Sequence, residues 1–578
     1  MEKVNVTING VSLRVPGGIT VIEAAKYANV EIPSLCYLKG LNELGACRIC
    51  LVDVKGQRAL VAACVFPVAE GMEIQTNTPA IRESRKHTLE LIVSDHKREC
   101  LSCVRSGSCQ LQKLCTDYGI DEHLFKGASY EYEIDDHSPS IVRENTKCVL
   151  CRRCIAACSK QQSVSVIDAI DRGFKTHIGC AFERSMNESP CVNCGQCIVA
   201  CPTGALHEKD DTKKVLDAIA DPDKKVFVFT APAIRVTIGE AFGMEPGTNV
   251  TGKLAAAIKR MGFDGVFDMN VTADLTIMEE AHEFLNRVKN GGKLPLITSC
   301  SPGWVKFCEH YFPDFTENLS TCKSPQQMFG AVLKTYYAEK NGIDPKNVFV
   351  VSVIPCTAKK FEVGRDDQSA AGVADVDVAL TTRELARMIK ADGVDFANLP
   401  DAEFDNPFET STGAAVIFGT SGGVLEAALR TASHWLDEKL ELVDFNEVRC
   451  SENIRRATYK VGGIDVKVAV ASGLANAREL LDSVKAGKED LHMIEIMACP
   501  GGCINGGGQP NQSDTVRNSV DLIAVRAKAI YDADKGLPLR KSHENPDVKR
   551  IYDEYLGSPG SHKAHDILHT KYVKRSAY

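Results

Sequence analysis

The stretch Leu296–Trp304, LITSCSPGW, decides the fold, because two later segments repeat its design. They are VSVIPCTAKKFE at Val351–Glu362 and IEIMACPGGCINGGG at Ile494–Gly508. Each begins as an apolar, β-branched run, typical of a buried strand, and then breaks into small residues and cysteine. In open α/β sheets, ligands bind beyond the carboxyl ends of the strands. A single cysteine is usually only a small buried hydrophobe, but matching strand ends predict one metal-binding crevice that holds Cys300, Cys356, Cys499 and Cys503.

The composition describes an ordinary globular chain of several domains. Its 578 residues are 44% hydrophobic and 25% charged, a length that allows about three to five domains of roughly 150 residues. A net charge of -8 argues against a nucleic-acid partner. No apolar run is long enough for a membrane span, and the first residues lack the layout of a signal peptide. We therefore expect a cytoplasmic protein without a membrane span.

Cysteine is the compositional anomaly. The chain has 24 cysteines, and 17 of them fall within the first 201 residues. In a large chain without a secretory signal, such clustering favours metal ligation by thiolates over disulfides.

Residues 1–79 are expected to form a β-grasp-like 2Fe-2S domain. The alternating segment VNVTINGVSLRV, with Asn9-Gly10 at its middle, predicts a two-stranded hairpin, and TVIEAAKYAN after it predicts a short helix. A C-x2-C pair with two flanking cysteines then resembles the 2Fe-2S ferredoxin arrangement, although the first gap is longer than in plant-type ferredoxins. A structural zinc site is the alternative. The predicted ligands are Cys36, Cys47, Cys50 and Cys64.

Residues 80–135 are expected to form a small helical domain with one further metal site. One histidine and three cysteines fit a zinc site as well as a 4Fe-4S cluster, and the spacing alone leaves both open. Of the two, we expect the 4Fe-4S cluster. The predicted ligands are His96, Cys100, Cys103 and Cys109.

Residues 136–209 carry the strongest motif, a doubled run of four cysteines. This pattern is the two-cluster ferredoxin signature, in which the fourth cysteine of each run ligates the other cluster. Ser159 replaces the usual proline after the first run, which alters the turn and not the ligation. The predicted 4Fe-4S ligands are Cys148, Cys151, Cys154 and Cys201 for one cluster, and Cys158, Cys191, Cys194 and Cys197 for the other.

Residues 210–515 change to alternating strand and helix patterns. VFVFTAP, TGKLAAAIKRMG and VFDMNV begin this alternation, which predicts parallel sheets covered by helices. We expect a large α/β catalytic domain with two sheet lobes, so that the whole chain is a multidomain α+β protein. The tail, 516–578, is predicted to be helical, with its charged residues on a solvated face packed around the larger domain.

With these residues in hand, the chain resembles the catalytic subunit of FeFe-hydrogenases over nearly its whole length. The segments that carry the resemblance are ITSCSPGW, VIPCTAKKFE, ADLTIMEEAHEF, KSPQQMFG and MACPGGCINGGGQP. It implies an H-cluster, in which a 4Fe-4S cubane shares a cysteine sulfur with a diiron unit bearing CO, cyanide and a dithiolate amine. It also implies the reversible conversion of two protons and two electrons into H2.

The resemblance assigns roles to individual residues. Cys356, Cys499 and Cys503 match cubane ligands, with Cys503 bridging to the diiron unit, and the family's fourth ligand position is Ser301 here. A hydroxyl is a harder and less acidic ligand than a thiol, so we expect a weakened cubane. The matching proton route is Cys300, Glu280, Ser320, Glu283 and Arg287, and Lys359 matches the lysine that holds a cyanide. The matching diiron pocket is lined by Ala231, Pro232, Met497 and Ile354, the last standing where the family often has methionine.

The expected partners follow from the same resemblance. The N-terminal modules resemble those of the large iron-sulfur subunit of respiratory NADH dehydrogenase. The PGGC segment and the KSHENP sequence of the tail resemble those of hydrogenase subunits in soluble NAD(P)-linked complexes. Because no nucleotide-binding fingerprint occurs at a strand-helix junction, any NAD(P) chemistry is expected on a flavin-containing subunit. Ferredoxin and a small 2Fe-2S subunit are the other expected partners.

Two other functions fit parts of the sequence. A formate- or NADH-dehydrogenase large subunit shares the pattern of residues 1–205, but the strand-end cysteines after residue 290 speak against it. A hydrogenase-like iron-sulfur sensor or assembly protein keeps the fold and the cubane and lacks the diiron unit. Ser301 favours that alternative, whereas Cys300, Lys359, Glu280 and Glu283 speak against it.

Overall fold

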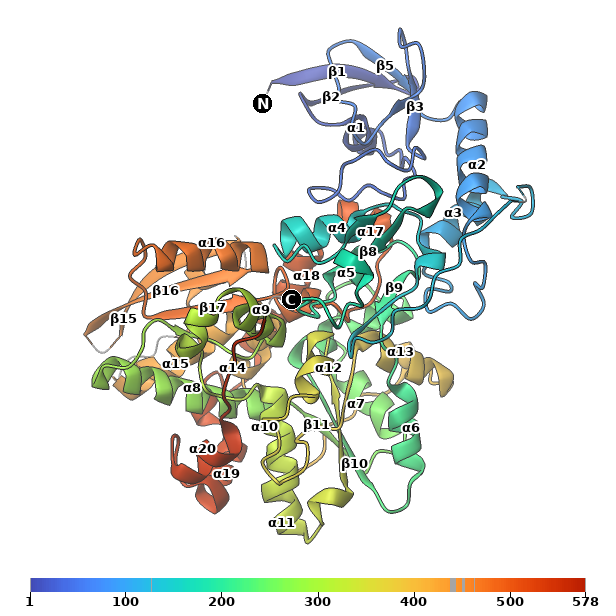
Figure 1. The fold of residues 1–578 in the computed structure, drawn as a ribbon. Helices are drawn as coiled ribbons and strands as arrows, with labels where there is room; N and C mark the ends of the chain where they lie inside the picture. The colour runs from blue at the N-terminus through green and yellow to red at the C-terminus, as the bar shows by residue number, and fades with distance from the viewer. Residues whose placement is uncertain (1, 126, 437–442, 450–452, 462, 577–578) are drawn as a thin grey trace.

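The computed structural model describes residues 2–125, 127–436, 443–449, 453–461 and 463–576. Figure 1 shows the N-terminal sheet at one end of the molecule and two larger sheets with their helices at the other. The cysteine-rich segment between them joins the two ends. None of the helices among the described residues is both long and apolar enough to cross a bilayer.

The N-terminal module is a five-stranded sheet of order β2-β1-β5-β3-β4. The predicted hairpin is present: Ile8 pairs with Val11, and the two residues between them have positive φ angles of 50° at Asn9 and 83° at Gly10. Thr20 and Glu23 form a capping box at the start of the predicted helix. The elements are β1 (Lys3–Ile8), β2 (Val11–Pro16), α1 (Val21–Tyr27), β3 (Leu51–Val54), β4 (Val61–Ala62) and β5 (Met72–Gln75).

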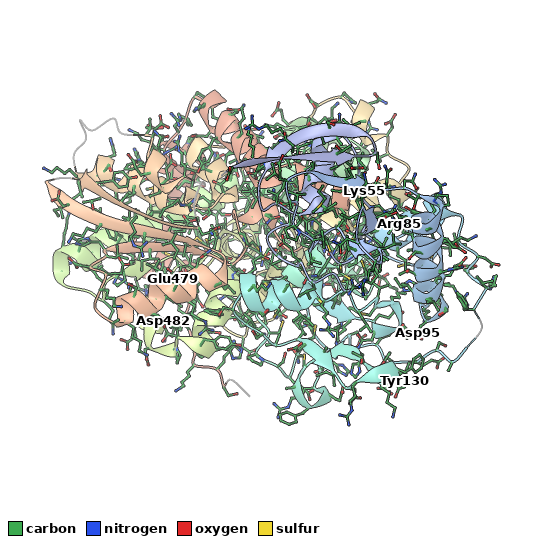
Figure 2. The ribbon with its side chains drawn as sticks, turned by 90° about the horizontal axis from the view of Figure 1, so that it is seen from above. Lys55, Arg85, Asp95, Tyr130, Glu479 and Asp482 are labelled. Carbon is green, nitrogen blue, oxygen red and sulfur yellow. The ribbon has the colours of Figure 1, made fainter. Side chains whose placement is uncertain are left out.

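Two helices, α2 (Pro79–Ser94) and α3 (Gln110–Tyr118), follow the N-terminal sheet. Arg85 of α2 is 3% exposed and donates to the carbonyl oxygens of Ile49, Leu51 and Thr76. Figure 2 shows Arg85 where α2 meets the sheet. Because a buried guanidinium needs all its partners, this residue fixes the helix against the N-terminal module.

The cysteine-rich segment is built from short paired elements. Strand β6 (Ile141–Arg143) pairs with β9 (Leu206–Glu208), so the two ends of the segment lie side by side. One short helix follows each start of a cysteine run, α4 (Arg153–Ala156) and α5 (Gln196–Ala200). The antiparallel pair β7 (Asp168–Ile170) and β8 (His177–Gly179) completes it.

The large region contains two four-stranded sheets. The first, of order β11-β10-β13-β14, is parallel throughout, as predicted. The second, of order β12-β17-β16-β15, is parallel except for its edge pair β15–β16, which is antiparallel. The expectation of purely parallel sheets was wrong at this edge, because Val461 pairs with Ile464 only three residues later, which only an antiparallel pair permits. The strands are β10 (Lys225–Thr230), β11 (Gly265–Asp268), β12 (Leu296–Ile297), β13 (Val348–Val353), β14 (Val378–Leu380), β15 (Ile454–Val461), β16 (Ile464–Ser472) and β17 (Met493–Met497).

Helix α8 (Asn270–Asn290) lies between the two lobes. Val271 and Leu275 belong to the core of the first sheet, whereas Ala273 and Ile277 belong to the core against the second. A helix with apolar contacts all round is a buried one. The other helices that surround these sheets are α6 (Thr212–Ala220), α7 (Thr251–Lys259), α9 (Pro302–Tyr311), α10 (Pro325–Val332), α11 (Ala338–Asn341), α12 (Ala358–Val363), α13 (Thr382–Ala391), α14 (Gly413–Val416), α15 (Gly423–Leu436) and α16 (Leu474–Lys485).

The tail is helical, as predicted, but part of its polar surface is buried. Arg526 forms a buried ion pair with Glu240, and Asp534 forms another with Arg430. The expectation that the polar tail residues form only a solvated face was therefore wrong, because several of them anchor the tail by pairing with buried charges of the large region. Its helices are α17 (Asp514–Ser519), α18 (Leu522–Gly536), α19 (Pro546–Ile551) and α20 (His562–Leu568).

Candidate active site and iron-sulfur relay

One cavity lies between the two large sheets and collects the strand-end residues. Strands β12 and β17 of one sheet and β13 of the other end at it. The sequence predicts that these strand ends meet at one crevice, and in the structure they come from two different sheets. Its lining includes the predicted ligand and pocket residues Cys300, Ser301, Cys356, Lys359, Cys499, Cys503, Ala231, Pro232, Ile354 and Met497.

Three of the lining thiols form a mutual group. Burial raises the pKa values of Cys356, Cys499 and Cys503, and that of Cys503 lies at about 12. The neighbouring Cys356 thiol contributes to the rise at both of the other two. Thiols this reluctant to ionise become thiolates only beside a cation. Their grouping therefore fits the iron cluster for which they were predicted.

The glycine loop that follows Cys503 closes tightly around this group. A Cβ atom on Gly506 would lie 2.0 Å from the carbonyl oxygen of Pro355, and one on Gly507 would lie 2.4 Å from that of Cys194. Neither position has room for a side chain. Because it carries no side chains, this run allows three backbone segments to approach one another.

Ser301 and Cys300 face different surroundings. Ser301 is the N-cap residue of α9, and its hydroxyl oxygen lies 3.4 Å from the backbone nitrogen of Ala498, next to Cys499. Burial, followed by the carboxylates of Glu280 and Glu495, holds the pKa of the Cys300 thiol well above its usual range. The thiol thus lies on the acidic side of the cavity, where a proton relay was predicted.

Helix α8 supplies the two acids of that relay. Glu280 is 1% exposed, and burial, with the nearby Glu283 carboxylate, raises its pKa to about 8. The Ser320 hydroxyl contacts Glu280 and donates to Oε2 of Glu283 at 3.0 Å. Arg287, one turn further along the helix, donates to Oε1 of Glu283 at 2.5 Å. One oxygen of Glu280, Oε2, is buried without a partner among the described atoms.

Lys359 has the partner that a buried ammonium requires. Its Nζ lies 2.9 Å from Oε2 of Glu362, which also accepts from the Ser324 hydroxyl at 2.8 Å and from the Gln326 amide at 3.0 Å. Because this carboxylate is so well supplied with donors, Lys359 has capacity left for an anion in the cavity.

The second ferredoxin-type cysteine run abuts the cavity directly. Cys194 is itself a lining residue, and Gln196 contacts the Cys499 thiol and donates from its amide to the carbonyl of Asn505 at 3.0 Å. The Thr357 hydroxyl donates to the carbonyl of Asn193 at 2.7 Å. Gln196 and Thr357 carry no recognisable spacing, so sequence reasoning missed them.

The structure brings the members of each crossed cysteine set close together. One small cavity is lined by Cys148, Cys151, Cys154 and Cys201, so the fourth cysteine of the second run does lie with the first run. Cys197 is influenced by the thiols of Cys191 and Cys158, and Cys194 by those of Cys197 and Cys191. Cys180, which sequence reasoning missed, lies close enough to Cys158 and Cys191 to interact with both. As an isolated cysteine, it gave no spacing signal.

The small helical module keeps its metal-binding residues available. His96 has a buried Nδ1 with no partner among the described atoms, and burial lowers its pKa to about 4, so the imidazole is neutral. Cys103 lies near Cys109, and a Cβ on Gly204 would stand 2.6 Å from the Cys103 sulfur. Cys115, which is not among the predicted ligands, lies close enough to Cys109 and Cys100 for their thiols to raise its pKa, in addition to the effect of burial.

The N-terminal module gathers its four predicted ligands. The sulfurs of Cys50 and Cys64 are 3.4 Å apart, and the Cys36 thiol contacts those of Cys47 and Cys64. Four thiols in mutual contact, in a module with all described cysteines free of disulfides, fit a cluster held by four thiolates.

Comparison with protein families assigns each of these modules. The description "2Fe-2S iron-sulfur cluster binding domain" matches residues 1–79, "NADH-ubiquinone oxidoreductase-G iron-sulfur binding region" matches 85–123, and "4Fe-4S dicluster domain" matches 147–205. "Iron only hydrogenase large subunit, C-terminal domain" matches 224–507, and "Iron hydrogenase small subunit" matches 520–575. The chain therefore carries 2Fe-2S and 4Fe-4S domains and a catalytic domain of the type that bears the H-cluster. These matches favour iron-sulfur clusters over zinc in the two N-terminal modules, where the cysteine spacing left both open.

Individual proteins agree over most or all of the chain. The NADP-reducing hydrogenase subunit HndD of Solidesulfovibrio fructosivorans is 48% identical over 100% of both chains. Iron hydrogenase 1 of Clostridium pasteurianum is 41% identical over 98% of this chain and 100% of its own. The solved structure of a variant of apo [FeFe]-hydrogenase HydA1 from Chlamydomonas reinhardtii is 39% identical, with a TM-score of 0.57, over 63% of this chain and 99% of its own. The chain belongs to the iron-only hydrogenase large-subunit family and is an oxidoreductase acting on H2.

Proposed function

We propose that the cavity between the two sheets is where H2 is formed and split. The bound H-cluster would supply the redox-active irons and the base at which protons and electrons meet. Cys356, Cys499 and Cys503 would hold its cubane, with Ser301 at the fourth position. The observation that carries this proposal is that these residues, Cys300 and Lys359 all line one cavity.

Protons would move between that cavity and solvent through side chains of α8 and its neighbours. Cys300 lies at the inner end. Glu280, with a pKa of about 8, keeps its proton at neutral pH and can donate it. The Ser320 hydroxyl stands between Glu280 and Glu283, and it can pass a proton by accepting one hydrogen bond and donating the other. Glu283, with a side chain 13% exposed, is the outermost acid, and Arg287 fixes its carboxylate.

Lys359 would orient the anionic side of the bound group. Its ammonium lies near Cys503 and lines the cavity. A charge-assisted hydrogen bond from a buried ammonium is roughly twice as strong as a neutral one, so this residue would set the position of an anionic ligand without taking part in electron transfer.

Electrons would reach the cavity along the cysteine-rich modules. In this proposal residues 1–79 form the β-grasp-like 2Fe-2S unit, 80–135 the 4Fe-4S unit with one histidine and three cysteine ligands, 136–209 the two-cluster unit, 210–515 the catalytic domain and 516–578 the small-subunit-like segment. The contact between Cys194 and the glycine loop supports the last step, because it places the final accessory ligand set against the cubane ligands.

The proton route is tested by replacing Glu280 with Gln. A positioned proton-transfer group contributes about 10²–10⁴-fold to a rate, so H2 evolution and H/D exchange should both fall by about 10²-fold or more. The matched control is Glu279→Gln, the neighbouring buried acid that faces the tail instead of Ser320. Equal losses in the two variants would refute the assigned route.

We also propose that the chain works within an NADP-linked complex. The relative HndD is named as a subunit of an NADP-reducing hydrogenase, and the present chain has no nucleotide-binding fingerprint of its own. The purified chain should reduce an artificial dye with H2 but should leave NADP+ unchanged until a flavin-containing partner is added. Reduction of NADP+ by the chain alone would contradict this.

The alternative function is an iron-sulfur sensor or assembly protein without the diiron unit. Ser301 is the residue that favours it. The contacts that run from Glu280 through Ser320 and Glu283 to Arg287 favour the hydrogenase, because an enzyme that moves protons to a buried site needs such a series of proton-carrying side chains.

A further inference from the structure

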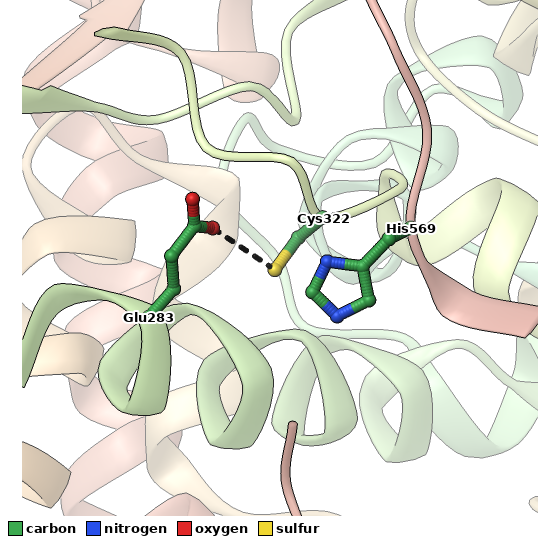
Figure 3. A group of neighbouring side chains, drawn as sticks. All are labelled: Glu283, Cys322 and His569. Carbon is green, nitrogen blue, oxygen red and sulfur yellow. Dashed lines mark hydrogen bonds between the residues drawn. The ribbon is translucent and has the colours of Figure 1, made fainter. Parts of the chain in front are cut away.

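A second group of metal-binding side chains lies beside the outer end of the proposed proton route. Glu283 of α8, Cys322 in the loop before α10, and His569 just after α20 each offer one ligand atom, and these atoms all lie within 4.8 Å of one another. Figure 3 shows the Cys322 thiol between the Glu283 carboxylate and the His569 ring. The three residues come from three separate parts of the chain.

The geometry points to a binding site for a thiophilic divalent cation such as Zn2+, held by Glu283, Cys322 and His569, that blocks the proton route when filled. Carboxylate oxygen, thiolate sulfur and imidazole nitrogen are each donor atoms that zinc binds in proteins. Three protein ligands leave the fourth tetrahedral position to water. The blocking effect rests on the proton route proposed above, whereas binding of the cation does not.

The backbone fixes two of these ligands against each other. Cys322 and His569 face one another in an antiparallel bridge. The nitrogen of Lys323 donates to the carbonyl of Leu568 at 2.8 Å, and that of Thr570 donates to the carbonyl of Thr321 at 2.8 Å. Preorganised ligands lose little freedom when a cation binds. The tail, which sequence reasoning assigned only to packing, thus completes the site.

The histidine already has the outer partner that metal-bound histidines generally have. Its Nε2 lies 3.1 Å from Oε2 of Glu279, whose carboxylate is held in turn by the backbone nitrogen of Gly560 and the Tyr552 hydroxyl. A carboxylate on one ring nitrogen orients the ring and strengthens the other nitrogen as a ligand. That other nitrogen, Nδ1, has the Thr321 hydroxyl at 2.7 Å as its hydrogen-bond partner within the described part of the chain, and a cation would replace this bond.

The local charge favours a cation. Burial raises the pKa of the Cys322 thiol, and the carboxylates of Glu283, Glu280 and Glu279 raise it further. The same negative potential that opposes a thiolate attracts a dication, and coordination removes the thiol proton to solvent. Arg287 opposes this charge and donates to Oε1 of Glu283. Oε2 accepts from the Ser320 hydroxyl and the Thr321 nitrogen, each at 3.0 Å, and lies 3.9 Å from the Cys322 sulfur.

A bound cation would stop proton movement because of which oxygen it takes. Oε2 of Glu283 accepts the hydrogen bond from Ser320, the link to the buried part of the route. A cation bound to that oxygen would occupy the lone pair that has to accept the proton from Ser320. The Glu283 side chain is 13% exposed, so an ion can arrive from solvent.

The experiment uses the intact, cluster-loaded enzyme with buffered Zn2+. Zinc should inhibit H2 evolution, and X-ray absorption at the zinc edge should show one sulfur at about 2.3 Å with nitrogen and oxygen at about 2.0–2.2 Å. Cys322→Ser and His569→Gln should each weaken inhibition and binding at least about tenfold, since even outer partners are worth this much. Each rate is compared with the same variant's rate without zinc.

Matched controls alter the same residue types outside the site. Cys308 is a buried free thiol, and His565 stacks on His569 with ring centroids 4.5 Å apart; Cys308→Ser and His565→Gln should keep full zinc sensitivity. Inhibition that is equal in all four variants, or a zinc spectrum without sulfur, would overturn the site. Sulfur-containing binding that is lost in Cys322→Ser but never inhibits would uphold the site and refute the proposed proton route.

Discussion

At the scale of single residues, Ser301 is where this chain departs from its family's pattern at a ligand position. Its hydroxyl lies next to Ala498 and Cys499 within the cavity lining, while Cys300 keeps to the side of Glu280. Pro302 fixes the turn at the start of α9, which disfavours a shift of one residue that would bring Cys300 to the position of Ser301. We therefore propose the serine as the residue at the fourth cubane position, and we expect a weakened cubane there.

Replacing Ser301 with Cys should raise both the iron content of the catalytic domain and the H2 activity. A thiolate is a softer ligand than a hydroxyl and holds iron more tightly. Iron per chain and H2 evolution should be measured on identically matured proteins, with Ser299→Cys as the control next to the site. Full iron content and unchanged activity before and after the substitution would show this expectation to be wrong.

Replacing His96 with Cys should lower the reduction potential of the cluster in the small helical module. The imidazole is neutral, since burial lowers its pKa to about 4, whereas a thiolate adds negative charge that disfavours the reduced cluster. A redox titration followed by electron paramagnetic resonance measures the change. Cys115 is a nearby thiol outside the predicted ligand set, so Cys115→Ser should leave the reduction potential unchanged. If His96→Cys also left the potential unchanged, His96 would not be a ligand of the cluster.

The buried acid Glu280 should make stability depend on pH. Its folded pKa is about 8 and its ordinary value is 4.5, so between these values the folded chain holds a proton that the unfolded chain has lost. Stability then falls as pH rises through this window and levels off above it. Glu280→Gln removes this dependence on pH. The unfolding temperature of the variant, relative to that of the parent protein, should therefore rise as the pH increases from 4.5 to 8. A constant difference across the window would contradict the raised pKa.

At the scale of elements, the glycine loop after β17 packs the second ferredoxin-type cysteine run against the catalytic cavity. Gly507 admits the carbonyl of Cys194, and Gly195, with a φ of 70°, admits the Thr357 hydroxyl at 2.4 Å from where its own Cβ would stand. The two loops interlock because neither carries side chains at the contact. This contact sets the separation between the two ligand sets.

Gly507→Ala should push these loops apart and slow electron transfer. The added Cβ would meet the Cys194 carbonyl at 2.4 Å, which forces backbone to move. Dye-linked H2 oxidation should fall, while H/D exchange, which needs no electrons from the relay, should be largely kept. Gly536→Ala is the control, because a Cβ there has nothing within 4 Å. Equal loss of both activities would place the damage at the catalytic site instead.

The sequence predicted elements best where spacing carried the signal. The N-terminal hairpin and the ends of β12, β13 and β17 were read from alternation and from apolar runs that end in cysteine. The antiparallel edge pair β15–β16 was missed, because the alternation of strands and helices gives no direction for a strand at a sheet edge. The buried ion pairs Arg526–Glu240 and Asp534–Arg430 were missed as well. No sequence pattern indicates which distant residue will pair with a given charged side chain.

At the scale of the whole molecule, the chain lines up cluster-binding modules in the order in which electrons would use them. Figure 1 shows the N-terminal sheet furthest from the two large sheets and the two-cluster segment between. Candidate ligands could be proposed from the C-x2-C spacings and the family resemblance, and they remain predictions. The tail's contribution at His569 could not, because Cys322 and His569 lie far apart along the chain and only the fold brings them together.

The most direct test of the central claim is the infrared spectrum of the matured chain. Only the diiron unit of an H-cluster supplies bound CO and cyanide, so their stretching bands should appear in the intact protein, shift when H2 is added, and disappear in Cys503→Ser. That result would place H2 chemistry in the cavity lined by Cys300, Cys356, Cys499 and Cys503. A fully matured chain with intact accessory clusters and no such bands would show that this cavity holds no diiron unit.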